Sequence, residues 1–96
     1  MDVKNKKMKV LRFPMLLVDE QRIQIQQGAE LLTVYMGHDY PCIWARVDTD
    51  APTVIRRFLV RGDGQASPGL ETAYVGTFQV AGGRLVFHVF DGGEEE

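Results

Sequence analysis

Disulfide chemistry is the first thing that the sequence lacks, because Cys42 is its only cysteine and no bridge can form within the chain. This cysteine usage fits a reducing compartment, so we expect a cytoplasmic protein. Cys42 stands beside Ile43 and Trp44, and a lone cysteine in such surroundings is typically a small buried hydrophobic residue. No apolar run approaches the roughly 20 residues that a membrane helix needs, so we expect no membrane contact.

Lysine is absent from residues 10–96, because all four lysines lie among the first nine residues, while three glutamates close the chain. We predict a basic arm over residues 1–8, one β domain over residues 9–91 and an acidic tail over residues 92–96. The ends either keep the protein in solution or let the arm contact a phosphate or an acidic partner. A net charge of −2 argues against direct nucleic-acid binding by the whole chain.

Residues that build metal and catalytic sites are also scarce. His38 and Cys42 fall within five residues, but no second pair of ligands stands at a spacing that zinc sites use. A nucleophile, a base and an orienting group cannot be assembled from neighbouring positions. We therefore expect no metal, no cofactor and no enzymatic activity. His88 lies in an apolar strand-like run, and we interpret it as hydrogen-bonded in the core or at a subunit interface.

Alternation of apolar and polar residues dominates the sequence and predicts strands. The expected strands cover residues 9–18, 22–26, 31–36, 41–47, 53–61, 71–80 and 84–91. Glycine-rich segments at 62–69 and 81–83 separate the last three strands and predict a loop and a tight turn. The fold class is therefore all-β, a small antiparallel barrel or sandwich of six to seven strands. A helix over residues 19–32 is the one competing interpretation.

The chain is short for a stable isolated domain. A chain of 96 residues buries only roughly 60–65% of the surface that its unfolded form exposes, so its core is thin. Self-association is a common remedy, and we expect a homo-oligomer.

Arginine and aromatic side chains on two neighbouring strands form the candidate binding surface. Guanidinium groups suit bidentate recognition of carboxylate or phosphate, and tryptophan beside arginine is common at protein interfaces. If strands 41–47 and 53–61 pair, these residues come close together. The candidate partner-binding residues are Tyr40, Trp44, Arg46, Arg56, Arg57 and Arg61. The alternative is a solvated sheet face whose arginines pair with Asp48, Asp50 and Asp63.

Four segments, 28–34, 41–52, 74–79 and 83–90, resemble in order and spacing a family of small proteins encoded by tailed bacteriophages and prophages. That family is classed as a domain of unknown function. Its most specific elements here are the Trp-Ala-x-Val-Asp run over 44–48 and the Phe-His-Val-Phe run over 87–90. Members usually carry Gly-x-Gly-His in the long loop, where this chain has Gln65 in place of the histidine. That departure argues against a shared catalytic or metal role for the loop.

The resemblance implies a phage origin and the cytoplasm of an infected bacterium as the setting, and it implies no reaction. Our first hypothesis is a non-enzymatic phage accessory protein that binds and modulates a host protein, as an inhibitor of host defence or in host takeover. One alternative is a homo-oligomer that sequesters a small signalling nucleotide. Another is a minor virion or assembly component.

Overall fold

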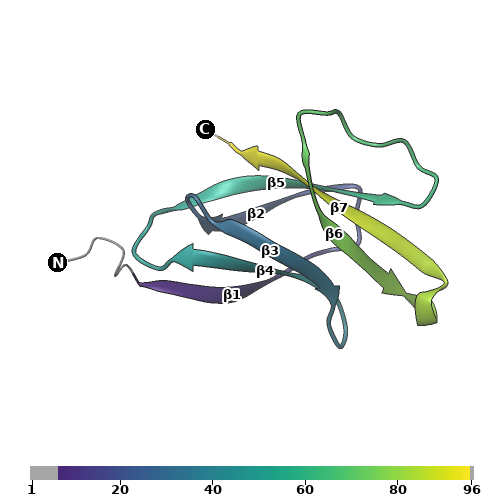
Figure 1. Cartoon of the computed structure of the whole chain (residues 1–96), viewed down its shortest axis with the longest axis horizontal. Helices are drawn as coiled ribbons and strands as arrows, with labels where there is room; N and C mark the ends of the chain where they lie inside the picture. Colours follow the sequence, from purple (N-terminus) through teal and green to yellow (C-terminus); the bar gives the residue numbers. More distant parts are fainter. Residues whose placement is uncertain (1–6, 96) are drawn as a thin grey trace.

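A computed structural model describes residues 7–95, which form seven strands in two antiparallel sheets that lie face to face (Figure 1). The strands are β1 (Met8–Pro14), β2 (Glu20–Gln26), β3 (Glu30–Met36), β4 (Pro41–Asp48), β5 (Thr53–Gly62), β6 (Ala73–Val80) and β7 (Leu85–Glu94). Sheet A has the order β1-β4-β3, and sheet B has the order β2-β5-β7-β6. The prediction of a small antiparallel sandwich is confirmed, and the competing helix over residues 19–32 is wrong.

Sheet A is organised by its central strand β4, which pairs with β1 on one side and β3 on the other. Ile43, Ala45 and Val47 are fully buried, whereas Trp44 and Arg46 lie on the opposite face. Successive side chains of a strand point to opposite faces, so this alternation divides β4 as the sequence predicts. Cys42 is buried, as expected for a small hydrophobic residue.

Sheet B supplies the other half of the core through β5, β6 and β7. The larger buried cluster spans both sheets and consists of Met15, Val34, Ile43, Phe58, Val60, Phe78 and Val89. A smaller cluster joins Ile25 of β2 to Ala29, Ala45 and Val47. Ile23 and Ile25 face the core while Arg22 and Gln24 face away, so the predicted alternation in this strand is confirmed.

The two sheets come closest where β6 passes over β3. A Cβ atom added at Gly76 would lie 2.8 Å from Cγ1 of Val34. The register of β6 against β7 also shifts between Tyr74 and Gly76, which is the signature of a β-bulge. Glycine is therefore needed at this position for steric reasons, because any side chain would push the sheets apart.

The turn between β6 and β7 confirms the predicted hairpin. Ala81, Gly82 and Gly83 all have positive φ values, of 55°, 66° and 88°. Glycine adopts such values without a steric penalty, which explains the glycine pair at this turn.

Several predicted boundaries are corrected, and the strand pairing on which the candidate binding surface depended is absent. β4 and β5 do not pair, because the connection between them crosses from sheet A to sheet B. The first strand ends at Pro14 rather than at residue 18, and β2 begins at Glu20 rather than at residue 22. β7 continues to Glu94, so residues 92–94 belong to the sheet and not to a tail. Most of the predicted basic arm, residues 1–6, lies outside the described residues.

No helix formed by residues 7–95 has the length and apolar character required to cross a bilayer.

The close approach of β6 to β3 predicts a strong effect of Gly76→Ala. The added methyl group must displace Val34 or the backbone, and such overpacking costs about 1–3 kcal/mol of unfolding free energy. Gly62→Ala is the matched control, because its added Cβ atom meets its neighbours at 3.5 Å, an ordinary contact distance. Urea denaturation of the two variants measures the difference, and equal stability would contradict the steric argument.

Candidate functional site

The candidate binding residues are divided between the two sheets. Trp44 and Arg46 belong to β4 and Tyr40 to the β3–β4 turn, all on the sheet A side. Arg56, Arg57 and Arg61 belong to β5 in sheet B. Since β4 and β5 do not pair, the structure does not gather these residues into the single surface that their neighbouring positions in sequence suggested.

Arg56 is engaged inside the molecule. Its Nε and Nη2 atoms donate to both carboxylate oxygens of Asp91 at 3.1 and 2.6 Å, and Nη1 donates to the carbonyl oxygen of Ala29 at 2.7 Å. The side chains of Arg56 and Asp91 are only 14% and 12% exposed. Arg56 thus ties β5 to β7 and to the residue before β3, and its planar fork is not available to a partner.

Arg57 and Arg61 share the outer face of sheet B, as predicted, but both serve local structure. Arg57 pairs with Glu20 of β2 at 3.4 Å. Arg61 donates to the carbonyl oxygens of Ala66 at 3.2 Å and Asp19 at 3.0 Å, which holds two connecting loops against β5. Arg61 is thus engaged by hydrogen bonds, whereas Arg57 makes a single ion pair and is 28% exposed.

The outer face of sheet A has a different character. Trp44 stacks on Tyr35, with ring centroids 5.5 Å apart and planes within 9° of parallel. The guanidinium of Arg12 lies over the Trp44 ring, 6.0 Å from its centroid. One side chain from each of the three strands thus forms a continuous stack across the sheet, since Arg12 is the register partner of Trp44. We call this surface the sheet A face; its residues are Met8, Val10, Arg12, Glu30, Tyr35, Trp44 and Arg46.

Arg12 is held on this face without a counter-ion. Among residues 7–95 no carboxylate forms an ion pair with it. A hydrogen bond with the Tyr35 phenol raises the pKa of Arg12 above its ordinary value, and electrostatic interactions with Tyr35, Cys42 and Tyr40 raise it further. The guanidinium is therefore permanently charged, and the aromatic stack fixes its position.

Exposed apolar side chains surround this charge. Met8 and Val10 of β1 are 46% and 54% exposed. Arg46, the predicted residue on this face, pairs with Glu30 at 3.0 Å, and both side chains remain half exposed. The face therefore combines aromatic, aliphatic and guanidinium groups, which is the composition of protein-interface centres.

A shallow pocket opens at one end of the sheet A face, beside the β3–β4 turn. It is lined by Arg12, Tyr35, Gly37, His38, Asp39, Tyr40 and Cys42. The His38 imidazole is almost fully exposed, and Asp39 places one negative charge at the rim. Tyr40, a predicted residue, is thus brought next to Arg12, which the sequence analysis did not select.

His88 lies on the outer face of sheet B and is 30% exposed, so it is not a core residue, and its alternative placement at a subunit interface stays a prediction. Its Nε2 atom contacts Oδ1 of Asp63 at 2.6 Å. Its Nδ1 atom contacts the hydroxyl groups of Thr77 at 3.1 Å and Tyr74 at 3.2 Å. The hydrogen bonding that was predicted for His88 is present, and it ties the loop after β5 to β6 and β7.

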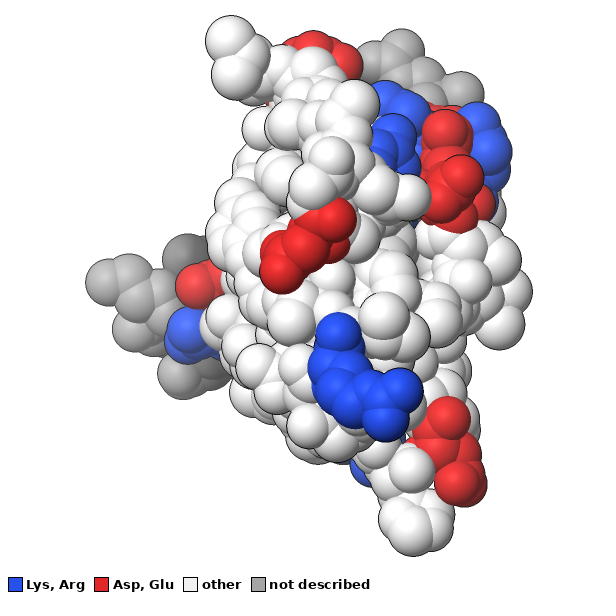
Figure 2. Space-filling view, turned by 90° about the vertical axis from the view of Figure 1, so that its right-hand side faces the viewer, with Lys and Arg blue, Asp and Glu red and all other residues white. Residues whose placement is uncertain are grey.

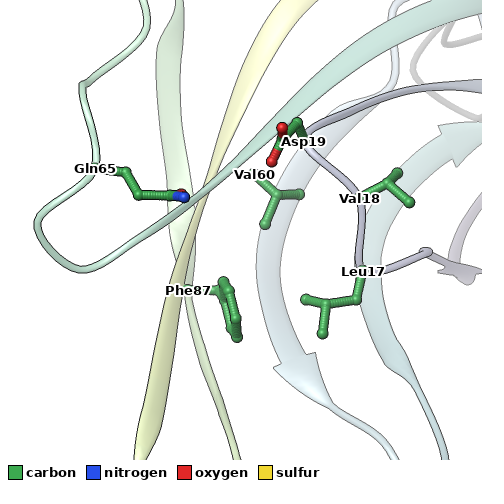
Figure 3. Close-up of a pocket in the computed structure, with 6 residues that line it drawn as sticks. All are labelled: Leu17, Val18, Asp19, Val60, Gln65 and Phe87. Atoms are coloured by element: carbon green, nitrogen blue, oxygen red, sulfur yellow. The ribbon is translucent and has the colours of Figure 1, made fainter.

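A second pocket lies between the β1–β2 connection and the ends of β5 and β7 (Figure 3). Leu17, Val18, Asp19, Val60, Gln65 and Phe87 line it, and Leu17 and Phe87 point toward one another across it. Alternation does not predict this pocket, because the apolar run over residues 9–18 is typical of a single strand. The available signal is a run of four apolar residues, Met15, Leu16, Leu17 and Val18, directly after Pro14.

Charge is not concentrated on the end of the molecule that carries the 62–72 loop and the β6–β7 turn. Figure 2 shows that end, where acidic and basic side chains are isolated or interleaved among uncharged surface. Within residues 7–95, no three His, Cys, Asp or Glu side chains gather in a way that could hold a metal ion.

Comparison with known proteins gives one match. The family model described as a domain of unknown function (DUF7352) matches residues 7–96. No curated protein and no solved structure matches the chain.

The largely enclosed pair of Arg56 and Asp91 predicts a clear effect of Asp91→Ala. Removing the carboxylate leaves the Arg56 charge without its counter-ion and two hydrogen bonds unmade, which costs about 2–3 kcal/mol of unfolding free energy. Glu30→Ala is the control, since it breaks the exposed pair with Arg46 and costs less than about 1 kcal/mol. Thermal and urea denaturation compare the two variants, and a similar small cost for both would show that Arg56 finds another partner or water.

Proposed function

We propose that this chain, which belongs over residues 7–96 to the DUF7352 family of domains of unknown function, is a non-enzymatic protein that binds a partner protein through the sheet A face. The stack of Tyr35, Trp44 and Arg12 is the observation that carries this proposal. Tryptophan, tyrosine and arginine are the residues that most often dominate binding energy at protein interfaces.

The stack favours binding because it is already ordered. Tyr35 and Trp44 are stacked on each other and the Arg12 guanidinium lies over the Trp44 ring, so part of the side-chain ordering that binding requires is already in place. Its unused N–H groups can donate to a carboxylate of the partner, while Met8 and Val10 supply apolar area beside it. The partner surface that fits is therefore apolar with an acidic side chain.

The biological setting is part of the proposal. The resemblance of four segments to proteins of tailed bacteriophages supports an accessory protein made in an infected bacterium. In that setting the partner is a host protein in the cytoplasm, and binding inhibits a host defence or redirects a host process. The division of the arginines supports one binding face on sheet A, since Arg56 is enclosed and Arg57 and Arg61 hold local structure.

A second candidate function is favoured by the pocket beside the β3–β4 turn. Arg12, His38 and the phenols of Tyr35 and Tyr40 offer a cation, an imidazole and hydrogen-bonding aromatics to one ligand. A small nucleotide, with a phosphate and a flat base, has the matching chemistry.

Charge reversal on the sheet A face tests the first proposal. Tagged wild-type protein is expected to retain a stoichiometric partner from a bacterial lysate, and Arg12→Glu is expected to lower its recovery by about tenfold or more, as for a hot-spot residue. Arg84→Glu is the matched control, because it makes the same charge change on an exposed arginine between β6 and β7. Absence of any stoichiometric partner, or equal loss with both variants, would contradict the proposal.

Thermal shift with a panel of nucleotides tests the second candidate. A nucleotide present at about 100 times its Kd raises the unfolding free energy by about 2.7 kcal/mol, which is readily seen as a higher Tm. Tyr40→Ala should abolish that rise, because Tyr40 lines the pocket and is 45% exposed. A Tm that stays constant across the panel rules this function out.

A further inference from the structure

The outer edge of β1 presents backbone groups that no strand formed by residues 7–95 covers. The carbonyl oxygen of Lys7 accepts from the N–H of Thr49, and the N–H of Met15 donates to the carbonyl oxygen of Pro41, each at 2.9 Å. In an antiparallel pair, residues that bond to the neighbouring strand alternate with residues whose N–H and C=O point away. The odd-numbered residues of β1 therefore face β4, and Met8, Val10 and Arg12 direct their N–H and C=O groups outward.

At its outward positions this edge is more apolar than the edge of β2. On β2 the same argument places the outward groups at even-numbered positions, because the N–H of Gln27 bonds to the carbonyl oxygen of Pro52. The side chains there are charged or polar: Glu20, Arg22, Gln24 and Gln26. Charged side chains on an edge discourage strand addition. β3 and β6 lie against each other, as the contact of Gly76 with Val34 shows. At the outward positions of β1, Arg12 is charged, but Met8 and Val10 are exposed apolar side chains, and the exposed Lys9 belongs to the opposite face.

We propose that a second copy of this chain pairs antiparallel along β1, with the twofold axis passing through Val10. In this register Val10 pairs with Val10 of the second copy, and Met8 pairs with its Arg12. All outward N–H groups of β1 then find a carbonyl acceptor, and so do those of the second copy. This inference goes beyond the proposed function and does not depend on it.

Two neighbouring residues favour this register over the register in which the twofold axis passes through Leu11. The shifted register would place Pro14, which has no N–H, inside the ladder opposite Met8. It would also bring the two Arg12 guanidinium groups to within about two residues of each other on one face, and like charges so placed repel. With the axis at Val10 they lie four residues apart, roughly 14 Å along the strands.

The side chains support the same pairing. Two Val10 side chains meet on the axis, and β-branched pairs stabilise neighbouring strands. The aliphatic stem of Arg12 lies beside Met8 of the second copy and covers its exposed thioether. On the inner face, half-buried Leu11 and Phe13 are covered by the stems of Lys9 and Lys7. Sheet A then becomes one six-stranded sheet, and Met8 of each copy adjoins the Arg12–Trp44–Tyr35 stack of the other.

Proline substitution tests the pairing. Val10→Pro removes an outward N–H on the axis and inserts a ring into the interface, so the dimer Kd should rise by at least about tenfold. Gln24→Pro is the matched control, because its N–H points outward from the polar edge of β2, and it should leave the Kd unchanged. Sedimentation equilibrium measures both, with circular dichroism to verify the fold.

A charge-complementation experiment keeps the proposal falsifiable if Val10→Pro fails to fold. Val10→Lys and Val10→Glu should each weaken the homodimer, because like charges then face each other on the axis. Mixing the two variants should restore dimers, which native mass spectrometry identifies as the mixed species. The proposal is overturned if the wild-type chain stays monomeric up to about 1 mM, because even a weak dimer with a small interface would be substantially populated at that concentration. A dimer that none of the Val10 variants affects also overturns it.

Discussion

The thin core between two sheets is the constraint on which the rest of this protein depends. Its buried clusters are filled mainly by alternate residues of β2 to β7, and half-buried Leu11 and Phe13 of β1 pack against them. One face of each strand therefore lies toward the core and the other toward solvent. In β4 that division buries Ile43 and Val47 and turns Trp44 and Arg46 outward. What the protein offers to a partner is therefore decided by the same alternation that gives it stability.

The fold was largely predictable from the sequence because alternation is a local signal. Strand number and class, the hairpin turn at 81–83 and the two faces of β4 all follow from it. The pairing of β4 with β1 and β3 did not follow, because the short connection after Asp48 can either close a hairpin or cross to the other sheet. That choice depends on pairing between residues far apart in sequence, such as Leu11 of β1 with Ala45 of β4.

The candidate site was predicted only in part, and Arg56 shows why. The sequence placed Arg56 on the same face of its strand as Phe58 and Val60, which proved to be the core face. The composition of the strand suggested a binding role for Arg56, whereas the alternation of its residues placed Arg56 on the inner face. An arginine can lie there because the Asp91 carboxylate neutralises its charge. Arg12 was missed for the opposite reason. Nothing in its own segment reveals that β1 lies beside Trp44, and only the register of sheet A joins the two.

The sheet A face and the edge of β1 draw on the same residues. The outward backbone positions of an antiparallel edge strand are also the positions whose side chains share one face, so Met8, Val10 and Arg12 contribute to both. Pairing along β1 uses their backbone groups and leaves the Arg12–Trp44–Tyr35 stack uncovered. A symmetric dimer would therefore present two such stacks on one continuous surface. For a partner that is itself symmetric, simultaneous contact with both would raise the effective affinity without any new type of contact.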